Sequence, residues 1–439
     1  MRYSEHDVLD FVRENDVKFI RLAFCDLFGI QKNISITDQE LPRAFEGGIS
    51  FDASAVEGFL NVDRSDLFLF PEPDTLAVLP WRPGRGRTAR LFCEIRHPDG
   101  TPFEGDGRYL LRRACERARG MGYLCQIGPE CEFYLFELDE KGNPSTLPID
   151  NAGYLDVAPA DRGENIRRDI CLTLEEMGIV PESFHHEQGP GQNEIDFRYS
   201  DALTAADQVV TFKGAVRTMA AQNGMYASFL PKPMLGCPGS GMHVNMSLLR
   251  DGRNVFQNIP GESSEEADQF LAGILLRVRE ITALLNPLTN SYRRFGSFEA
   301  PRYVTWSHSN RSQLIRIPAM TGEYTRIELR SPDPACNPYF AFALLLHAGL
   351  DGIEGKVALP GPCEQDLYHA DPALLERFSQ LPASLGEALD LLEQSDFARR
   401  VLPADTLEKF IRAKRREQAA VLHAEDSFGL EHRTDFLRY

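Results

Sequence analysis

The sequence contains no C-x-x-C pair among its nine cysteines and no long apolar segment. An odd cysteine count without such pairs argues against a disulfide framework and against a structural zinc site. The longest apolar run, YFAFALLLHAGL at 339–350, is too short to cross a bilayer and predicts a core helix instead. The opening residues, MRYSEHDVLDFVREN, are polar and do not have the pattern of a secretory signal. These absences predict a reduced, cytoplasmic protein with no membrane partner.

Basic charge is also scarce, because 47 lysines and arginines face 65 acidic residues and the net charge is −18. Nucleic-acid phosphates require a basic footprint, so no nucleic-acid partner is expected. The sequence also lacks G-x-x-x-x-G-K-[ST], which excludes a P-loop. What is present is typical of a globular protein: 43% hydrophobic residues, 26% charged residues, and 439 residues, enough for two or three domains.

The chain divides into two parts near residue 100. The first 99 residues are rich in strand patterns, and VKFIRLAFCD followed by FGIQKNISI predicts a hairpin. A linker-like stretch, HPDGTPFEGDG at 97–107, leads to Asp106, which can cap a following helix. Residues 100–439 mix strands with helices predicted near 164–178, 204–223, 265–285 and 336–350. The sequence TLEKFIRAKRREQAAVLHAE near the C-terminus predicts an exposed, charged helix.

Two glutamates stand two positions apart in the apolar run IGPECEFYLFE at 127–137. Side chains alternate along a strand, so Glu130 and Glu132 share one face, and two like charges there repel unless a cation lies between them. Similar strand patterns hold four more possible ligands: Glu187, Glu194, His243 and Glu328. Any one of these alone is more often an ordinary surface or salt-bridged side chain. Together, five glutamates and one histidine indicate two adjacent sites for Mg²⁺ or Mn²⁺.

Arginines gather in the same half of the chain. They are Arg294, Arg311, Arg316, Arg326 and Arg330. Guanidinium groups suit carboxylate and phosphate ligands. Metal ligands and arginines beside the glycine turn of GSGMHVNMS predict a phosphoryl-transfer site, in which the protein positions the groups and neutralises their charge.

These residues fall in motifs through which the chain resembles type I glutamine synthetase over nearly its whole length. The matching stretches are FDASAVEGF (51–59), GPECEFYLFE (128–137), GENIRRD (163–169), HHEQGPGQNEIDF (185–197), KPMLGCPGSGMHVNMS (232–247), NPLTNSYRR (286–294), NRSQLIRIP (310–318) and RIELRSPDPACNPY (326–339). The resemblance implies an α+β protein with a β-grasp domain over residues 1–99 and a catalytic, ATP- and metal-binding α/β domain over 100–439. It also implies a homo-oligomer of two stacked six-membered rings, with active sites between neighbouring subunits.

The resemblance also implies roles for individual residues. One metal ion is expected at Glu132, Glu187 and Glu194, and a second at Glu130, His243 and Glu328. The ATP-contacting positions are Glu182, Tyr199, Asn245, Ser247, Arg311, Arg316 and Arg326. The positions for glutamate, ammonium or the transferred phosphate are Asp66, Tyr154, Gly239, Arg294, Glu299, Arg311 and Arg330. Asp52, Glu299 and Arg311 are expected to be catalytic.

The implied reaction has two steps and two possible acceptors. ATP phosphorylates the side-chain carboxylate of L-glutamate, and ammonia then attacks the acyl phosphate to give L-glutamine, ADP and phosphate. Asp52, Asp66 and Tyr154 match the ammonium pocket, and Glu299 matches a flap that closes the site against water. A γ-glutamyl-amine ligase, which joins glutamate to a polyamine or another amine, is the alternative. Retention of the acidic pocket favours ammonia, because a small cation needs a carboxylate.

Several positions depart from the family pattern. The flap stretch RRFGSFEAP is one residue shorter than usual, and Ala55 replaces a serine. Asn61 stands where members under glutamine feedback have an arginine. Tyr368 is followed by His369 rather than by the aspartate of members switched by adenylylation. Neither form of regulation is therefore expected. A non-catalytic relative of the fold would be expected to lose metal ligands, whereas all six are present in this sequence.

Overall fold

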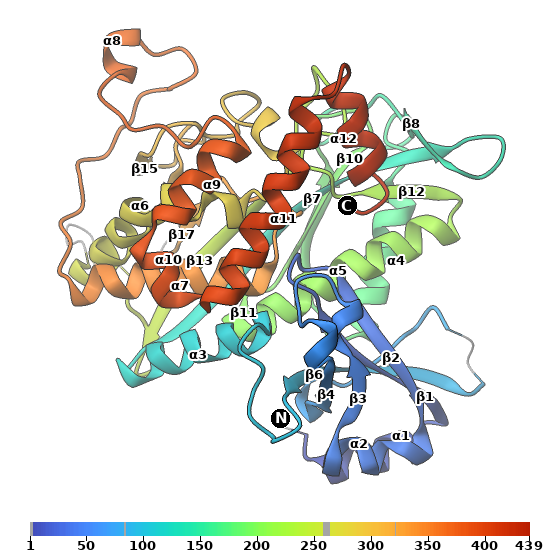
Figure 1. Cartoon of the computed structure of the whole chain (residues 1–439). Helices are drawn as coiled ribbons and strands as arrows, with labels where there is room; N and C mark the ends of the chain where they lie inside the picture. The colour runs from blue at the N-terminus through green and yellow to red at the C-terminus, as the bar shows by residue number, and fades with distance from the viewer. Residues whose placement is uncertain (1–2, 83–84, 258–263, 321) are drawn as a thin grey trace.

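The computed structural model describes residues 3–82, 85–257, 264–320 and 322–439. A small N-terminal sheet lies beside a larger sheet that carries most of the helices (Figure 1). The strands are β1 (Val17–Cys25), β2 (Gln31–Thr37), β3 (Ile49–Asp52), β4 (Asp66–Pro71), β5 (Ala77–Val78), β6 (Arg87–Arg96), β7 (Leu124–Leu138), β8 (Pro144–Pro148), β9 (Pro181–His186), β10 (Gln192–Phe197), β11 (Ser200–Asp201), β12 (Met225–Ser228), β13 (Met242–Arg250), β14 (Arg253–Asn254), β15 (Trp306–His308), β16 (Ile315–Ile317) and β17 (Ile327–Leu329). The helices are α1 (Glu5–Glu14), α2 (Leu41–Gly47), α3 (Gly107–Gly120), α4 (Glu164–Glu176), α5 (Ala202–Gln222), α6 (Glu265–Leu285), α7 (Pro338–Glu354), α8 (Pro372–Leu375), α9 (Leu385–Gln394), α10 (Asp396–Val401), α11 (Ala404–Leu422) and α12 (Ser427–Asp435).

The N-terminal sheet has the strand order β2-β1-β6-β4-β3, with β5 paired to β6. Strands β1 and β2 form the predicted antiparallel hairpin, and β1 runs parallel to β6. Apolar residues of α1 and α2 pack on this sheet to form a separate core. The short strand β3 lies at one edge of the sheet, and Asp52 is its last residue. This edge therefore presents Asp52 at the surface of the N-terminal part.

The larger sheet has the strand order β15-β16-β17-β13-β7-β10-β9. The 15-residue strand β7 is its longest element, and it pairs with β13 on one side and β10 on the other. Three shorter strands, β8, β11 and β12, also pair with β7. Since β7 contains Glu130 and Glu132, the two glutamates lie in the middle of the sheet, flanked by strands on both sides.

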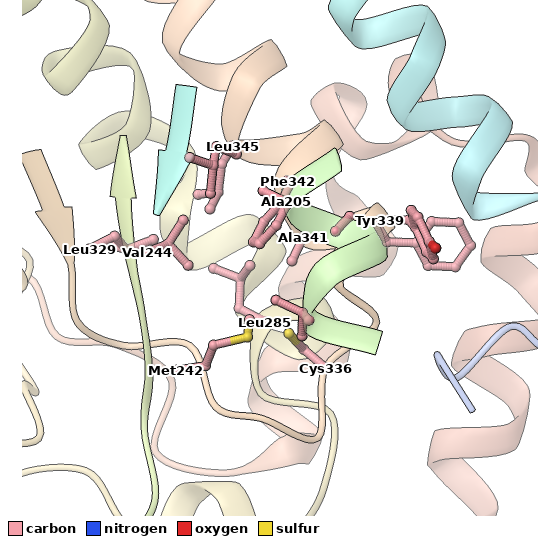
Figure 2. Packing of buried hydrophobic residues seen from close by; sticks show 14 of the residues in the cluster. Ala205, Met242, Val244, Leu285, Leu329, Cys336, Tyr339, Ala341, Phe342 and Leu345 are labelled. Carbon is pink, nitrogen blue, oxygen red and sulfur yellow. The ribbon is translucent and has the colours of Figure 1, made fainter. Parts of the chain in front are cut away.

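The alternation predicted from the sequence separates core from site. Cys131 and Phe133 of β7 and Met242 and Val244 of β13 enter the main apolar core. The opposite face of the same strands carries the charged residues. Helix α7, predicted from the run at 339–350, is almost fully buried against this core. Figure 2 shows Phe342 and Leu345 of this helix in the same apolar cluster as Met242 and Val244. The helices thus cover one face of the sheet.

Two local predictions for the remaining helices gave different results. Asp106 caps α3 as predicted, because its carboxylate accepts a hydrogen bond from the Arg108 N–H at 3.0 Å. The exposed, charged helix predicted near the C-terminus is present as α11, but one of its faces is buried. Leu407 and Phe410 are buried, and the Lys414 ammonium lies 4.8 Å from the centre of the Phe28 ring. A charged sequence can bury one face when long side chains extend along apolar surface.

The described residues contain no helix that is both long enough and apolar enough to span a membrane.

Candidate active site

The register of the large sheet brings the separated acidic residues together. Glu132 lies directly opposite Glu194 on β10. Glu130 lies opposite Asp196 on one neighbouring strand and opposite His243 on the other. Glu328 is reached one strand further along, where β17 pairs with β13. Cross-strand neighbours have their Cβ atoms about 5 Å apart, so these carboxylates must face one another.

The first group of ligands consists of Glu132, Glu187 and Glu194. Glu132 Oε2 accepts hydrogen bonds from the Gly241 N–H at 2.8 Å and from Gln192 Nε2 at 3.1 Å. Burial, reinforced by the charge of Glu187, raises the pKa of Glu132 to about 8. Burial and neighbouring carboxylates also raise the pKa of Glu194 well above its ordinary value. Ionising all three carboxylates is therefore unfavourable unless a cation is bound.

The second group consists of Glu130, His243 and Glu328. His243 Nδ1 lies 3.3 Å from Glu130 Oε2 and 3.6 Å from Glu328 Oε1. Burial, together with the charge of Arg330, lowers the pKa of His243, which favours the neutral ring that a metal ion requires. Glu328 is almost fully buried, and its two oxygens accept hydrogen bonds from Arg316 and Arg330.

The second group, Glu130, His243 and Glu328, can offer three ligand atoms within 4.8 Å of one another. The members of the first group meet this condition in two overlapping sets, Glu132 and Glu194 with His243, and Glu187 and Glu194 with His185. Carboxylate oxygens with an imidazole nitrogen are suitable ligands for Mg²⁺ and, more favourably, for Mn²⁺. The pKa values of Glu132 and Glu194 are raised because buried negative charges lie close together without a compensating positive charge. A bound cation would supply that positive charge.

A cavity of about 410 Å³ opens above these groups. The arginines predicted from the sequence, all of which line it, are Arg294, Arg311, Arg316, Arg326 and Arg330. Arg294 is fixed by hydrogen bonds from its guanidinium to the carbonyl oxygens of Ser331 at 2.8 Å and Arg330 at 2.9 Å. Gly239 borders the cavity where a Cβ atom would lie 2.5 Å from the Pro231 carbonyl oxygen. Glycine is therefore required for this close approach.

The predicted flap residue Glu299 lines the same cavity. Its carboxylate lies 3.6 Å from Arg330 and 3.9 Å from Arg311, and it accepts a hydrogen bond from Gln188 Nε2 at 3.2 Å. Phe298 and Glu299 both have positive φ values, 50° and 62°, which are unfavourable for residues with a side chain. Glu299 thus combines a strained backbone conformation with contacts to Arg311 and Arg330 at the edge of the larger cavity.

A second cavity of about 360 Å³ adjoins the first, and both are lined by Glu130, Asp196 and Arg326. The predicted nucleotide-binding residues in its wall are Glu182, Tyr199, Asn245, Ser247 and Arg326. Tyr324 and Met320 add partly exposed apolar surface. A nucleotide could therefore place its planar base in this second cavity and its phosphates at the junction with the first.

Asp52 and Asp66 are paired with each other across β3 and β4. Neither lines the two cavities of its own chain, as far as the described residues show. Tyr154, predicted for the same ammonium pocket, does line the larger cavity, and its ring lies 5.4 Å from that of His185. The chain thus brings Tyr154 to the site but leaves the two aspartates in the N-terminal part.

Reasoning from the sequence missed several residues that line the two cavities, among them His185, Gln192, Asp196 and Tyr324. Two-residue alternation could have found three of them. His185 precedes Glu187 by two positions, and Gln192 and Asp196 flank Glu194 at the same spacing. Tyr324 had no such signal, because it lies in a short turn that the fold brings to the second cavity.

Comparisons with known proteins agree with this architecture. Residues 16–98 match the family model described as glutamine synthetase, beta-Grasp domain, and residues 104–432 match glutamine synthetase, catalytic domain. The chain is 47% identical over 425 residues to a glutamine synthetase of Clostridium saccharobutylicum, covering 95% of each. It is 48% identical over 428 residues to that of Methanosarcina mazei, covering 96% of each. A solved structure of a GmaS/ADP complex superimposes with a TM-score of 0.87 at 30% identity, covering 98% of this chain and 99% of that one. The chain therefore belongs to the glutamine synthetase family of ATP-dependent ligases.

Proposed function

We propose that the protein is a glutamate–ammonia ligase, which forms L-glutamine, ADP and phosphate from L-glutamate, ammonium and ATP. The observation that carries this proposal is the pair of adjoining cavities, which share Glu130, Asp196 and Arg326 above the two groups of metal ligands. Glutamate would occupy the larger, arginine-lined cavity and ATP the smaller one. Their reacting groups would then meet at the shared wall, beside the metal ligand Glu130 and the guanidinium of Arg326.

We infer that the metal ions are Mg²⁺ or Mn²⁺, two or more in each site. Glu132, Glu187 and Glu194 would hold the ion on the glutamate side, and Glu130, His243 and Glu328 the ion on the ATP side. When bound, such ions neutralise phosphate charge and orient the transferred group. The protein's own contribution is the fixed donors around them, such as the Gly241 N–H that orients Glu132.

The first step transfers the γ-phosphoryl group of ATP to an oxygen of the glutamate side-chain carboxylate. The bond between the β- and γ-phosphates breaks, ADP leaves, and an acyl phosphate forms. Arg294, held by two carbonyl oxygens, is already oriented to bind an anionic group in the cavity. Arg311 is half-exposed, which suits a residue that closes on the transferred phosphate. Glu299 would cover this part of the site and exclude water.

The second step requires deprotonation of ammonium. Asp52 Oδ1 accepts hydrogen bonds from the N–H and hydroxyl of Ser54, at 2.9 Å and 2.6 Å, and these bonds lower the pKa of Asp52. Its ionised carboxylate would attract ammonium and take one proton. The resulting ammonia attacks the acyl carbon, the carbon–oxygen bond to phosphate breaks, and the leaving phosphate takes the second proton from nitrogen to leave the amide.

We further propose that Asp52 and Asp66 serve the cavity of a neighbouring subunit in a dodecamer of two stacked six-membered rings. Asp52 lies on the edge strand β3 and Asp66 on the adjacent strand β4, away from the two cavities of their own chain, and this position supports the assignment. The domain division at residues 99 and 100 stays a prediction. A cytoplasmic location is supported by the nine cysteines, all of which are free.

A γ-glutamyl-amine ligase is the second candidate. The solved structures that resemble this chain include GmaS, a γ-glutamylmethylamide synthetase, at 30% identity. The curated relatives named glutamine synthetase are 44% to 48% identical, which favours ammonia.

The test is phosphate release from ATP and glutamate with ammonium, compared with methylamine, ethylamine, putrescine and spermidine. Product identity would be checked by mass spectrometry. We expect kcat/KM to be highest for ammonium, with glutamine as the product. A higher kcat/KM for any of the amines would overturn the proposed acceptor and would leave the ligase chemistry in place.

A further inference from the structure

His185 lies among the carboxylates on the glutamate side, although it is not one of the six ligands that the family motifs imply. It is on β9, directly opposite Glu194 of β10. Its Nε2 atom lies 3.4 Å from Glu194 Oε1, and its Nδ1 atom lies 3.6 Å from Glu187 Oε1. His185, Glu187 and Glu194 can offer three ligand atoms within 4.8 Å of one another. Metal–ligand bonds of about 2.1–2.3 Å allow such separations.

One ring nitrogen of His185 faces a backbone carbonyl oxygen. Its Nδ1 atom lies 3.2 Å from the His186 carbonyl oxygen, which can only accept a hydrogen bond. A hydrogen bond donated by Nδ1 to this carbonyl would leave the lone pair of a neutral ring on Nε2, the atom nearest Glu194. A histidine that binds a metal ion through one nitrogen usually donates its other N–H to a carbonyl or carboxylate in this way.

The surroundings of the ring also suit a ligand. The His185 side chain is only 20% exposed, it lines the larger cavity, and the edge of the Tyr154 ring packs against it. The adjacent His186 provides a contrast. Its Nδ1 faces the Glu187 carbonyl oxygen at 2.6 Å, and its Nε2 faces Asp150 at 3.0 Å. The nitrogens of His186 thus face Asp150 and a backbone carbonyl oxygen, so of these two neighbouring histidines His185 is the one with a nitrogen beside Glu194.

We propose that His185 Nε2 is a fourth protein ligand of the cation held by Glu132, Glu187 and Glu194. The inference rests on the proposed metal site, and it does not depend on whether ammonia or an amine is the acceptor. Its chemical consequence concerns metal choice. A site made only of carboxylates suits Mg²⁺, whereas an added imidazole increases the preference for Mn²⁺. With His185 as a ligand, the glutamate-side site would therefore prefer Mn²⁺ over Mg²⁺ more strongly than a site made of the three carboxylates alone.

A spectroscopic experiment can distinguish metal binding by His185 from metal binding by the six ligands of the family motifs alone. The full-length protein would be loaded with Mn²⁺, without substrates, and pulsed electron paramagnetic resonance would record the ¹⁴N modulation of metal-bound imidazole. The informative variant is His243→Gln, which removes the histidine of the ATP-side group. If His185 binds the cation, this variant keeps an imidazole signal, and the double variant His185→Gln/His243→Gln loses it. If only carboxylates bind on the glutamate side, His243→Gln alone abolishes the signal, and the proposal is wrong.

Binding measurements provide a second readout. We expect His185→Gln to weaken Mn²⁺ binding at least about tenfold, with a smaller loss for Mg²⁺, in titrations followed by calorimetry. His6→Gln is the matched control, because His6 is 81% exposed on α1, and it should bind both ions like the unmodified protein. Equal losses of Mn²⁺ and Mg²⁺ binding in His185→Gln would indicate that His185 only supports Glu187 and Glu194, and would contradict ligation. Thermal melting in EDTA checks that each variant is folded.

Failure of these tests can be distinguished from failure of the proposed function. If wild-type protein binds no Mn²⁺ at all, the metal site itself is wrong. If it binds Mn²⁺ and forms glutamine but gives no imidazole signal in His243→Gln, only the assignment of His185 is refuted.

Discussion

Replacing Glu132 with glutamine should stabilise the metal-free protein while removing its response to metal. The Glu132 carboxylate is buried, and its pKa is raised to about 8 by burial and by Glu187. At pH 7 the folded protein must therefore keep a proton on a group whose ordinary pKa is 4.5. Holding that proton about 2.5 pH units above the ordinary pKa costs about 3 kcal/mol of folding free energy, at about 1.4 kcal/mol per unit.

Glutamine has nearly the same shape and no charge, so it should avoid this cost. Its carbonyl oxygen can keep the hydrogen bonds from the Gly241 N–H and Gln192, and its amide can face the carboxylate of Glu187. For a 439-residue chain, an unfolding entropy of about 0.9 kcal/mol/K converts about 3 kcal/mol into a rise in Tm of about 3 °C. The measurement is differential scanning calorimetry at pH 7 in EDTA.

The same variant should respond weakly to metal. Binding at 100 times the Kd stabilises a folded protein by about 2.7 kcal/mol, so saturating Mn²⁺ should raise the Tm of the unmodified protein by several degrees. Glu132→Gln should show much less of this gain. Glu137→Gln is the matched control, because Glu137 lies on the same strand outside both groups of ligands and is partly exposed. A lower Tm for Glu132→Gln in EDTA, or an undiminished gain with Mn²⁺, would refute the reasoning.

Three further predictions follow from other parts of the structure. Asp52→Ala should lose glutamine formation far more than it loses slow glutamate-dependent ATP hydrolysis. Mixing Asp52→Ala subunits with inactive Glu132→Ala subunits should restore part of the activity in hybrid oligomers. No recovery of activity in confirmed hybrids would mean that the active site is not shared between subunits. Tyr324→Ala should raise the KM for ATP about tenfold, as expected from lost ring stacking of about 1–3 kcal/mol, and leave the KM for glutamate unchanged; equal changes in both would contradict its place in the nucleotide cavity. Burial and Glu417 raise the pKa of Asp435 to about 6, so its ionisation destabilises the folded chain as the pH rises from about 4 to 7. The Tm advantage of Asp435→Asn over the unmodified protein should therefore increase over this range, and an advantage that is constant with pH would show that the carboxylate is not responsible.

Much of the local structure was determined by the sequence itself. The two-residue alternation in IGPECEFYLFE and in GSGMHVNMS separated the apolar residues of β7 and β13 from the charged face, because a strand turns successive side chains to opposite sides. The cap at Asp106 and the buried helix α7 were predicted for similarly local reasons. Patterns of this kind depend only on neighbours in the chain, so they can be read without knowing the fold.

Only the tertiary structure decided which of these faces meet. The register that sets Glu132 against Glu194 joins strands more than 60 positions apart, and no local pattern fixes that offset. The fold likewise pairs Arg316 and Arg330 with Glu328, although the sequence presented them as groups for phosphate or glutamate. It also buries Lys414 against Phe28, on a helix whose sequence predicted exposure. Strand pairing and helix burial depend on the summed packing of distant residues, which is why the ligand types could be predicted from the sequence and their arrangement around His185 could not.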